Sequence, residues 1–207
     1  IEYFFEEEYH NADFKTGKNL LILNVIDKYL HRFLDMECEQ VKRERIEVLY
    51  LEKGLKVPLG TQADGFPFEV NLRGIVDRVD RRDGVLHIID YKTGVVESSD
   101  VGITDADKWE LLLKDVKYSK AFQLLTYAYM YRKTFAVQED LTVGNISFKR
   151  LNQGLLRFYT KKDKSAEYYK QAPNNYIVDS AILAQYWEQT RALLLEIFND
   201  QVPFVEM

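Results

Sequence analysis

The feature that most constrains the fold is the segment from Gly74 to Gly94, which predicts two β-strands joined by a tight turn. Its sequence reads GIVDRVDRRDGVLHIIDYKTG. Asp83 and Gly84 form the predicted turn, because glycine tolerates a positive φ and an Asp side chain can accept a hydrogen bond from nearby backbone. The segment therefore predicts a β-hairpin whose second strand ends in a charged tripeptide.

That charged end of the hairpin is the candidate site. Side chains alternate along a strand, so Asp90 and Lys92 share one face, and an antiparallel partner strand can bring Asp77 opposite Asp90. Two close carboxylates repel unless a cation or a proton lies between them, which favours a hard-cation site. Lys92 could orient or activate a water molecule, or stabilise charge on a phosphate. A structural ion cluster of the same three residues is the alternative.

Three groups of residues, the last of them on a predicted helix further along the chain, together form a recognisable motif. Asp77 followed by Asp90-Tyr91-Lys92 resembles the signature of the PD-(D/E)XK nuclease superfamily. The fuller pattern is Gly-x-x-Asp-Arg-x-Asp, then Asp-Tyr-Lys-Thr-Gly, then Gln-x-x-x-Tyr, which here is Gln123 to Tyr127. This three-part pattern is similar to that of the RecB/AddB-type nuclease branch. The resemblance covers about residues 46–160.

The resemblance implies a site chemistry residue by residue. Asp77 and Asp90 would hold Mg²⁺ or Mn²⁺ together with the backbone carbonyl of Tyr91. Lys92 would be the third catalytic residue, beside Asp77 and Asp90. Gln123 and Tyr127 either support the site and contact DNA, or only tie their helix to the sheet.

The resemblance also implies a fold and a role. The expected fold class is α/β, with a restriction-endonuclease-like mixed central sheet flanked by helices. The expected function is metal-dependent hydrolysis of DNA phosphodiester bonds, as the exonuclease part of a helicase–nuclease in double-strand-break repair and recombination. Its partners would be single-stranded DNA or duplex ends and a helicase domain or subunit. The alternative is a degenerate nuclease-like domain that binds DNA or a partner without cleavage.

Composition excludes several classes of protein and of cofactor site. Cys38 is the single cysteine, which excludes a self-contained four-cysteine iron–sulfur cluster and an internal disulfide framework, and indicates a reducing, cytoplasmic compartment. No apolar run approaches the length of a membrane span. The net charge of −5 argues against a broadly basic DNA-binding surface, while leaving room for a local basic groove.

Hydrophobic periodicity and turn residues predict a single domain over residues 1–207 with mixed strands and helices. Ile22, Ile26, Tyr29, Leu30 and Phe33 recur at helical spacing and are interpreted as a core-facing stripe. A change of apolar phase at Gly74 predicts a β-bulge there. The expected elements are helices at 18–45, 105–114, 119–134 and 179–198, strands at 46–59, 66–80 and 85–92, and a closing hairpin between 141 and 160.

One element of the related pattern is missing. Relatives of the RecB type carry a His or Glu metal ligand on a helix upstream of the sheet. His10 and the run from Glu6 to Glu8 are the upstream candidates, but their surroundings do not match that setting. Because the sequence starts abruptly at Ile1, we expect the chain to be excised from a longer one, with weak or no activity when isolated.

Overall fold

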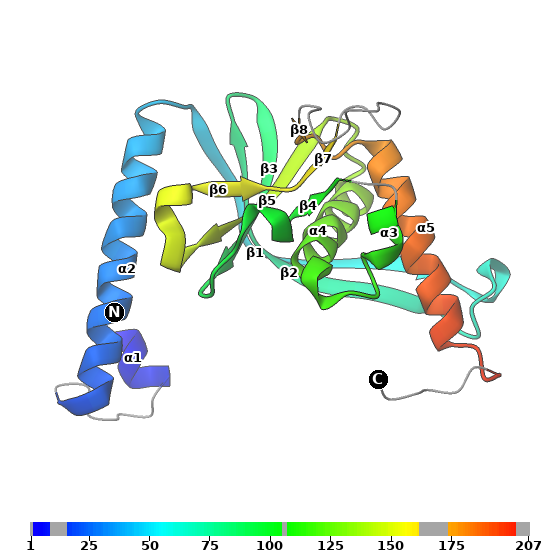
Figure 1. Cartoon of the computed structure of the whole chain (residues 1–207), viewed down its shortest axis with the longest axis horizontal. Helices are drawn as coiled ribbons and strands as arrows, with labels where there is room; N and C mark the ends of the chain where they lie inside the picture. Colours follow the sequence, from blue (N-terminus) through cyan, green and yellow to red (C-terminus); the bar gives the residue numbers. More distant parts are fainter. Residues whose placement is uncertain (1, 9–15, 105–106, 162–173, 202–207) are drawn as a thin grey trace.

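The computed structural model describes residues 2–8, 16–104, 107–161 and 174–201. At its centre is a mixed sheet in the order β1-β2-β3-β5-β6 (Figure 1). Strands β3 and β5 are parallel, and the other neighbouring pairs are antiparallel. The predicted α/β class with a mixed sheet is therefore confirmed. The strands are β1 (Ile46–Gly60), β2 (Val70–Arg82), β3 (Val85–Lys92), β5 (Leu141–Ser147) and β6 (Leu155–Arg157).

A second, three-stranded sheet lies beside the first, in the order β4-β7-β8. Its strands are short: β4 (Gly102–Ile103), β7 (Tyr159–Lys161) and β8 (Asn174–Asn175). β7 follows β6 after a single residue, so one stretch of chain continues from the edge of the large sheet into the small one. Among the described residues, four 3-10 turns lie in the connections, namely η1 (Gln62–Asp64), η2 (Ser98–Asp100), η3 (Val116–Tyr118) and η4 (Phe148–Gln153).

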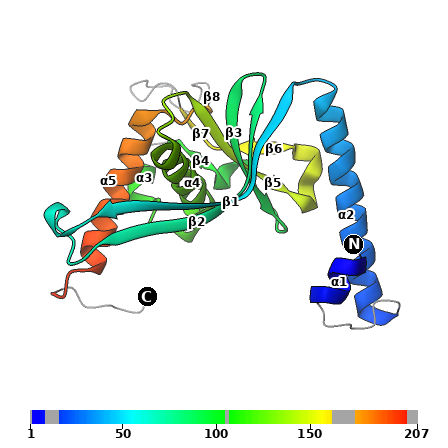
Figure 2. The same ribbon diagram turned by 180° about the vertical axis from the view of Figure 1, so that it is seen from behind.

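The helices flank the large sheet, as Figures 1 and 2 show from opposite sides. They are α1 (Glu2–Glu8), α2 (Gly17–Val41), α3 (Asp107–Leu111), α4 (Ser119–Phe135) and α5 (Ser180–Ile197). α5 packs on α4, where Tyr129 and Trp187 stack with ring centroids 5.4 Å apart. Asp179 begins α5 as an N-cap, because its Oδ1 accepts the Ile182 N–H at 2.8 Å. Among the described residues, no helix combines the length and apolar character that a membrane crossing needs.

The hydrophobic core lies between α4 and the large sheet. Fully buried leucine and alanine side chains of α4 meet fully buried valine and isoleucine side chains of the strands. Removing apolar surface from water contributes about 25 cal/mol per Å², so this interface holds α4 against the sheet. Representative members of the core are Val76, Val79, Ile88, Leu124, Leu125, Ala128 and Val143.

The bulge predicted at Gly74 was wrong. Gly74 pairs in register with Leu55, and the register shifts of the β1–β2 ladder lie between Val48 and Tyr50 and between Pro58 and Gly60. A Cβ at position 74 would lie 2.8 Å from Met130 Cε. The missing side chain at Gly74 thus leaves room for the Met130 side chain of α4, and the irregularity that the sequence suggested belongs to the other strand.

The core-facing stripe predicted along α2 was also wrong. Leu23 is the buried residue of this helix, while the predicted stripe is half-buried. The stripe as far as Leu30 instead lines a groove of about 600 Å³, whose other wall is formed by Thr93, Gly94 and Phe148. The physical reason is that α2 contacts the sheet near its C-terminal end, through Phe33, Glu37 and Gln40, so the apolar residues before Phe33 are left beside a loop.

Gly144 in β5 offers a test of how closely the strands pack around the site. A Cβ there would lie 2.6 Å from the backbone oxygen of Leu156 and 3.1 Å from Arg157 Cα, and backbone atoms cannot rotate away. Gly144→Ala should therefore lower the free energy of unfolding by about 1–3 kcal/mol, measured by urea denaturation. Gly54→Ala is the matched strand-glycine control, because nothing lies within 4 Å of its Cβ. Equal effects of both substitutions would contradict this packing.

Candidate active site

The middle of β2 and the C-terminal end of β3 bring the two predicted carboxylates together. Arg78 pairs with Ile89, so extending this antiparallel register by one residue sets Asp77 opposite Asp90. Asp77 also accepts the backbone N–H of Tyr91 through Oδ2 at 2.7 Å. The side chain of one strand is thus fixed by the backbone of the next, directly beside Asp90.

Lys92 lies between the sheet and α4. Its Nζ donates to Asp90 Oδ2 at 2.8 Å and to Gln123 Oε1 at 2.6 Å. About one quarter of the Lys92 side chain is exposed, whereas Asp90 is almost fully buried. The ammonium group therefore lies at the boundary between the buried carboxylate and solvent, where a substrate can reach it.

Helix α4 presents Gln123 and Tyr127 on one face because residues four apart lie above each other on a helix. Gln123 Nε2 donates to Tyr127 Oη at 2.9 Å, while Gln123 Oε1 accepts from Lys92. Burial raises the pKa of Tyr127, and the negative charges of Asp90 and Asp77 raise it further. Tyr127 is therefore protonated at neutral pH, close to both carboxylates. The structure brings all of the predicted side chains into one constellation; their functional roles stay predictions.

The electrostatics of Asp90 reflect competing effects. Burial is the largest and raises the pKa of Asp90, because a low-dielectric environment penalises the charged form. Lys92 opposes this shift through its hydrogen bond and its charge, while the neighbouring Asp77 carboxylate adds to it. The net direction is upward. A cation beside Asp77 and Asp90 would act in the same sense as Lys92 and favour the ionised form.

Asn145 also contacts the constellation, and sequence reasoning missed it. It lies on β5, is fully buried, and pairs in parallel with Asp90. Its Nδ2 donates to Asp90 Oδ2 at 2.7 Å. A signal was available in the sequence, because an amide in the run LTVGNIS is out of place in a strand buried along its whole length.

The chemistry of these donors fits a divalent cation. Asp77 and Asp90 could supply carboxylate oxygens to a cation, and the backbone carbonyl of Tyr91 could supply a third oxygen. Mg²⁺ is commonly bound by one or two carboxylates, with water and substrate phosphates filling the other positions. Within the described residues, no three His, Cys, Asp or Glu side chains are grouped so that they could hold a metal. His10 and the Glu6 side chain lie outside the described residues, and the Glu7 and Glu8 side chains are exposed.

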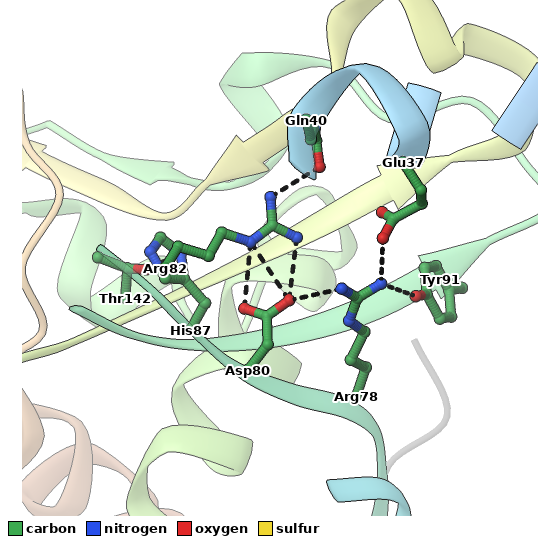
Figure 3. Close-up of polar contacts among 8 residues, drawn as sticks. All are labelled: Glu37, Gln40, Arg78, Asp80, Arg82, His87, Tyr91 and Thr142. Atoms are coloured by element: carbon green, nitrogen blue, oxygen red, sulfur yellow. Dashed lines mark hydrogen bonds and ion pairs between the residues drawn. The ribbon is translucent and has the colours of Figure 1, made fainter. Parts of the chain in front are cut away.

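A buried ion network occupies the opposite face of β2 (Figure 3). Arg78 contacts Asp80 at 2.9 Å on the face that strand alternation sets opposite Asp77. Arg82 also contacts Asp80, at 3.1 Å. Glu37 and Gln40 of α2 bind Arg78 and Arg82 at 2.7 and 2.9 Å. The network therefore fastens the C-terminal end of α2 to the sheet.

Tyr91 connects the network to the candidate site. Its hydroxyl accepts a hydrogen bond from Arg78 Nη1 at 3.3 Å on one face of the sheet. Its ring packs against Phe33 and Phe148, with centroids 5.5 and 5.9 Å away. On the other side, its backbone N–H binds Asp77. The backbone between Asp90 and Lys92 is thus held from both faces of β3.

His87 lies at the edge of the same network (Figure 3), and within the described residues it belongs to no group of three or more potential metal-ligating side chains. Its Nδ1 is hydrogen-bonded to Thr142 Oγ1 at 2.7 Å. Burial, followed by the positive charge of Arg82, lowers the pKa of His87 to about 4. The imidazole is therefore neutral at neutral pH.

Comparison with known proteins identifies a family. A family model described as the PD-(D/E)XK nuclease superfamily matches residues 3–207. The match spans nearly the whole chain and includes every residue of the constellation. No significant match is found among curated proteins.

The buried network predicts a large effect from a small change. Asp80→Asn keeps the side-chain volume but leaves Arg78 and Arg82 facing each other without their shared carboxylate. Removing one partner of a buried ion pair costs about 3–5 kcal/mol. The free energy of unfolding from urea titration should fall by that amount.

The matched control for this prediction is Glu139→Gln. Glu139 binds Arg81 at 2.7 Å, but both side chains are substantially exposed. Solvent-exposed pairs contribute about 0–1 kcal/mol. A loss at Asp80 no larger than the loss at Glu139 would refute the stabilising role of the buried network.

Proposed function

The chain belongs to the PD-(D/E)XK nuclease superfamily, and we propose that it is a metal-dependent DNA nuclease with Asp77, Asp90 and Lys92 as its catalytic residues. The observation that carries this proposal is the position of the Lys92 ammonium, which lies 2.8 Å from Asp90 and 2.6 Å from Gln123. A lysine held in this way beside paired carboxylates has the geometry that phosphodiester hydrolysis needs.

Asp77, Asp90 and the Tyr91 carbonyl would hold the cation, with Mg²⁺ or Mn²⁺ as the proposed ions. All three donors are oxygens, which suit hard divalent cations. Members of this superfamily typically use divalent metals. Such an ion would supply two effects when bound: a lower pKa for an associated water molecule and neutralisation of phosphate charge.

The roles of the other residues follow from their hydrogen bonds. An ammonium group has three N–H donors, and Lys92 uses two of them on Asp90 and Gln123. The third can donate to an attacking water or to a phosphate oxygen. Gln123 is itself fixed by Tyr127, so the Lys92 side chain is held in place from α4. A fixed donor stabilises developing charge without reorganising during the reaction.

The proposed biological setting is the RecB/AddB-type branch, acting as the exonuclease part of a helicase–nuclease in double-strand-break repair. Support comes from the three-part motif, because Gln123 and Tyr127 accompany the two carboxylates and the lysine. A direct test uses DNA oligonucleotides labelled at one end, in single-stranded and duplex form, with Mn²⁺. Mononucleotide or short products from an end indicate exonuclease action, whereas internal fragments indicate an endonuclease and would contradict this setting.

A degenerate domain that binds DNA or a partner without cleavage is the second candidate. It is favoured by one observation: the described residues do not group a third carboxylate or histidine with Asp77 and Asp90. The two candidates differ in a measurable way. A degenerate domain would bind labelled DNA without metal-dependent cleavage, and substitution of Lys92 would leave its function intact.

Metal binding gives the first test. Mg²⁺ or Mn²⁺ should raise the unfolding temperature, because a ligand that binds only the folded state stabilises it by about 2.7 kcal/mol at one hundred times its Kd. Asp90→Asn should abolish this metal-induced shift. Asp100→Asn is the control, since Asp100 pairs with Lys120 instead. An unchanged metal response in Asp90→Asn would refute the assigned ligand.

Lys92 gives the second test. Lys92→Ala should remove Mn²⁺-dependent cleavage of single-stranded DNA while keeping the metal-induced stabilisation, because an ammonium group cannot be a metal ligand. The matched control is Lys120→Ala, a lysine of similar exposure that binds Asp100 at 2.9 Å. Cleavage at the wild-type rate by Lys92→Ala would mean that the chemistry lies elsewhere.

A further inference from the structure

Asn145 is a buried polar residue whose presence in β5 needs an explanation. Its side chain is fully buried in a strand in which every residue is buried. An apolar side chain of the same size would fill this position without burying an amide. Transfer of an amide into the protein interior without full hydrogen bonding costs roughly 1–3 kcal/mol. Asn145 is therefore an expensive choice on packing grounds alone.

The hydrogen bonds of Asn145 converge on Asp90. Its Nδ2 donates to Asp90 Oδ2 at 2.7 Å and approaches the Asp90 backbone oxygen at 3.4 Å. The parallel pairing of β3 and β5 sets the two residues side by side on the same face. Lys92 donates to the same Asp90 Oδ2 at 2.8 Å. One carboxylate oxygen is thus fixed by two donors from two strands.

The other end of the amide has no such role. Asn145 Oδ1 is buried and has no hydrogen-bond partner among the described residues. Reversing the amide would not help, because Oδ1 would then face the Asp90 carboxylate and two acceptors would repel. The amide accordingly satisfies Asp90 at the expense of its own oxygen. The hydrogen bond from Nδ2 to the Asp90 carboxylate explains why an amide stands at this position.

We infer that Asn145 is a positioning residue, which presets the orientation of the Asp90 carboxylate for cation binding. This inference rests on the proposed function, since it assigns Asp90 to a cation. By holding Oδ2, Asn145 prevents rotation of the carboxylate and leaves its orientation fixed before the cation arrives. Residues that orient metal ligands in this way typically change metal affinity or activity 10- to 100-fold when they are removed.

The test is the Mn²⁺ concentration that gives half of the maximal thermal stabilisation. Asn145→Leu keeps a similar volume and removes the donor, so this midpoint should rise about 10- to 100-fold. If Asn145→Leu does not fold, Asn145→Ala removes the same donor without adding apolar bulk and should move the midpoint in the same direction. Metal-dependent cleavage at saturating Mn²⁺ is the second readout, and it should recover more fully than cleavage at low Mn²⁺.

Thr142→Val is the matched control on the same strand. Thr142 is also buried and polar, but its hydroxyl binds His87 on the opposite face of the sheet. Its substitution should lower the unfolding temperature without moving the Mn²⁺ midpoint. A purely structural Asn145 would behave in this way too, so an unchanged midpoint in both Asn145 variants would overturn the inference. If the wild-type protein itself shows no metal-induced stabilisation, the proposed function fails and this inference fails with it.

Discussion

The structure depends on pairing the charges that β2 and β3 bury on both faces of the sheet. Asp90 is buried on one face and Asp80 on the other, and a carboxylate without partners in either position would cost several kcal/mol. Each is therefore paired with polar side chains, which come from β3 and β5 for Asp90 and from β2 itself for Asp80. Lys92 and Asn145 reach Asp90, while Arg78 and Arg82 reach Asp80. Asn145 thereby ties β5 to β3, and Glu37 and Gln40 tie α2 to the arginines of β2.

The two faces resolve the same physical problem with different consequences. Around Asp80, two arginines exceed the charge of the one carboxylate, and Glu37 of α2 supplies a second. Around Asp90, a second carboxylate lies close by and only Lys92 offsets the charge among the groups that shift its pKa. The charges on the face of Asp80 are balanced by side chains of the chain itself. The face that carries Asp77 and Asp90 has excess negative charge. A divalent cation would neutralise this excess charge. The excess is the physical basis for proposing that the face of Asp77 and Asp90 is the active one.

Some polar atoms in these clusters have no hydrogen-bond partner within the part of the chain that the structure describes. They include Glu37 Oε1, Arg78 Nε and Asn145 Oδ1. Each unsatisfied buried group costs about 1–3 kcal/mol, which apolar residues would avoid. These unsatisfied atoms thus lower the free energy of unfolding, and they lie among the residues that hold Tyr91 and Asp90 in place. Tyr91 is the link between the clusters, since its hydroxyl binds Arg78 and its N–H binds Asp77.

The sequence by itself determined the hairpin, the alternation that separates Asp77 from Arg78, and the motif residues from Asp90 to Tyr127. These follow from local periodicity and from spacing along one chain segment. The tertiary structure alone decided that Asn145 meets Asp90 across 55 residues, that Gly74 admits α4, and that the apolar residues of α2 line a groove. Such contacts depend on which elements pack together, and strand order and helix placement are set by long-range burial that no local period encodes.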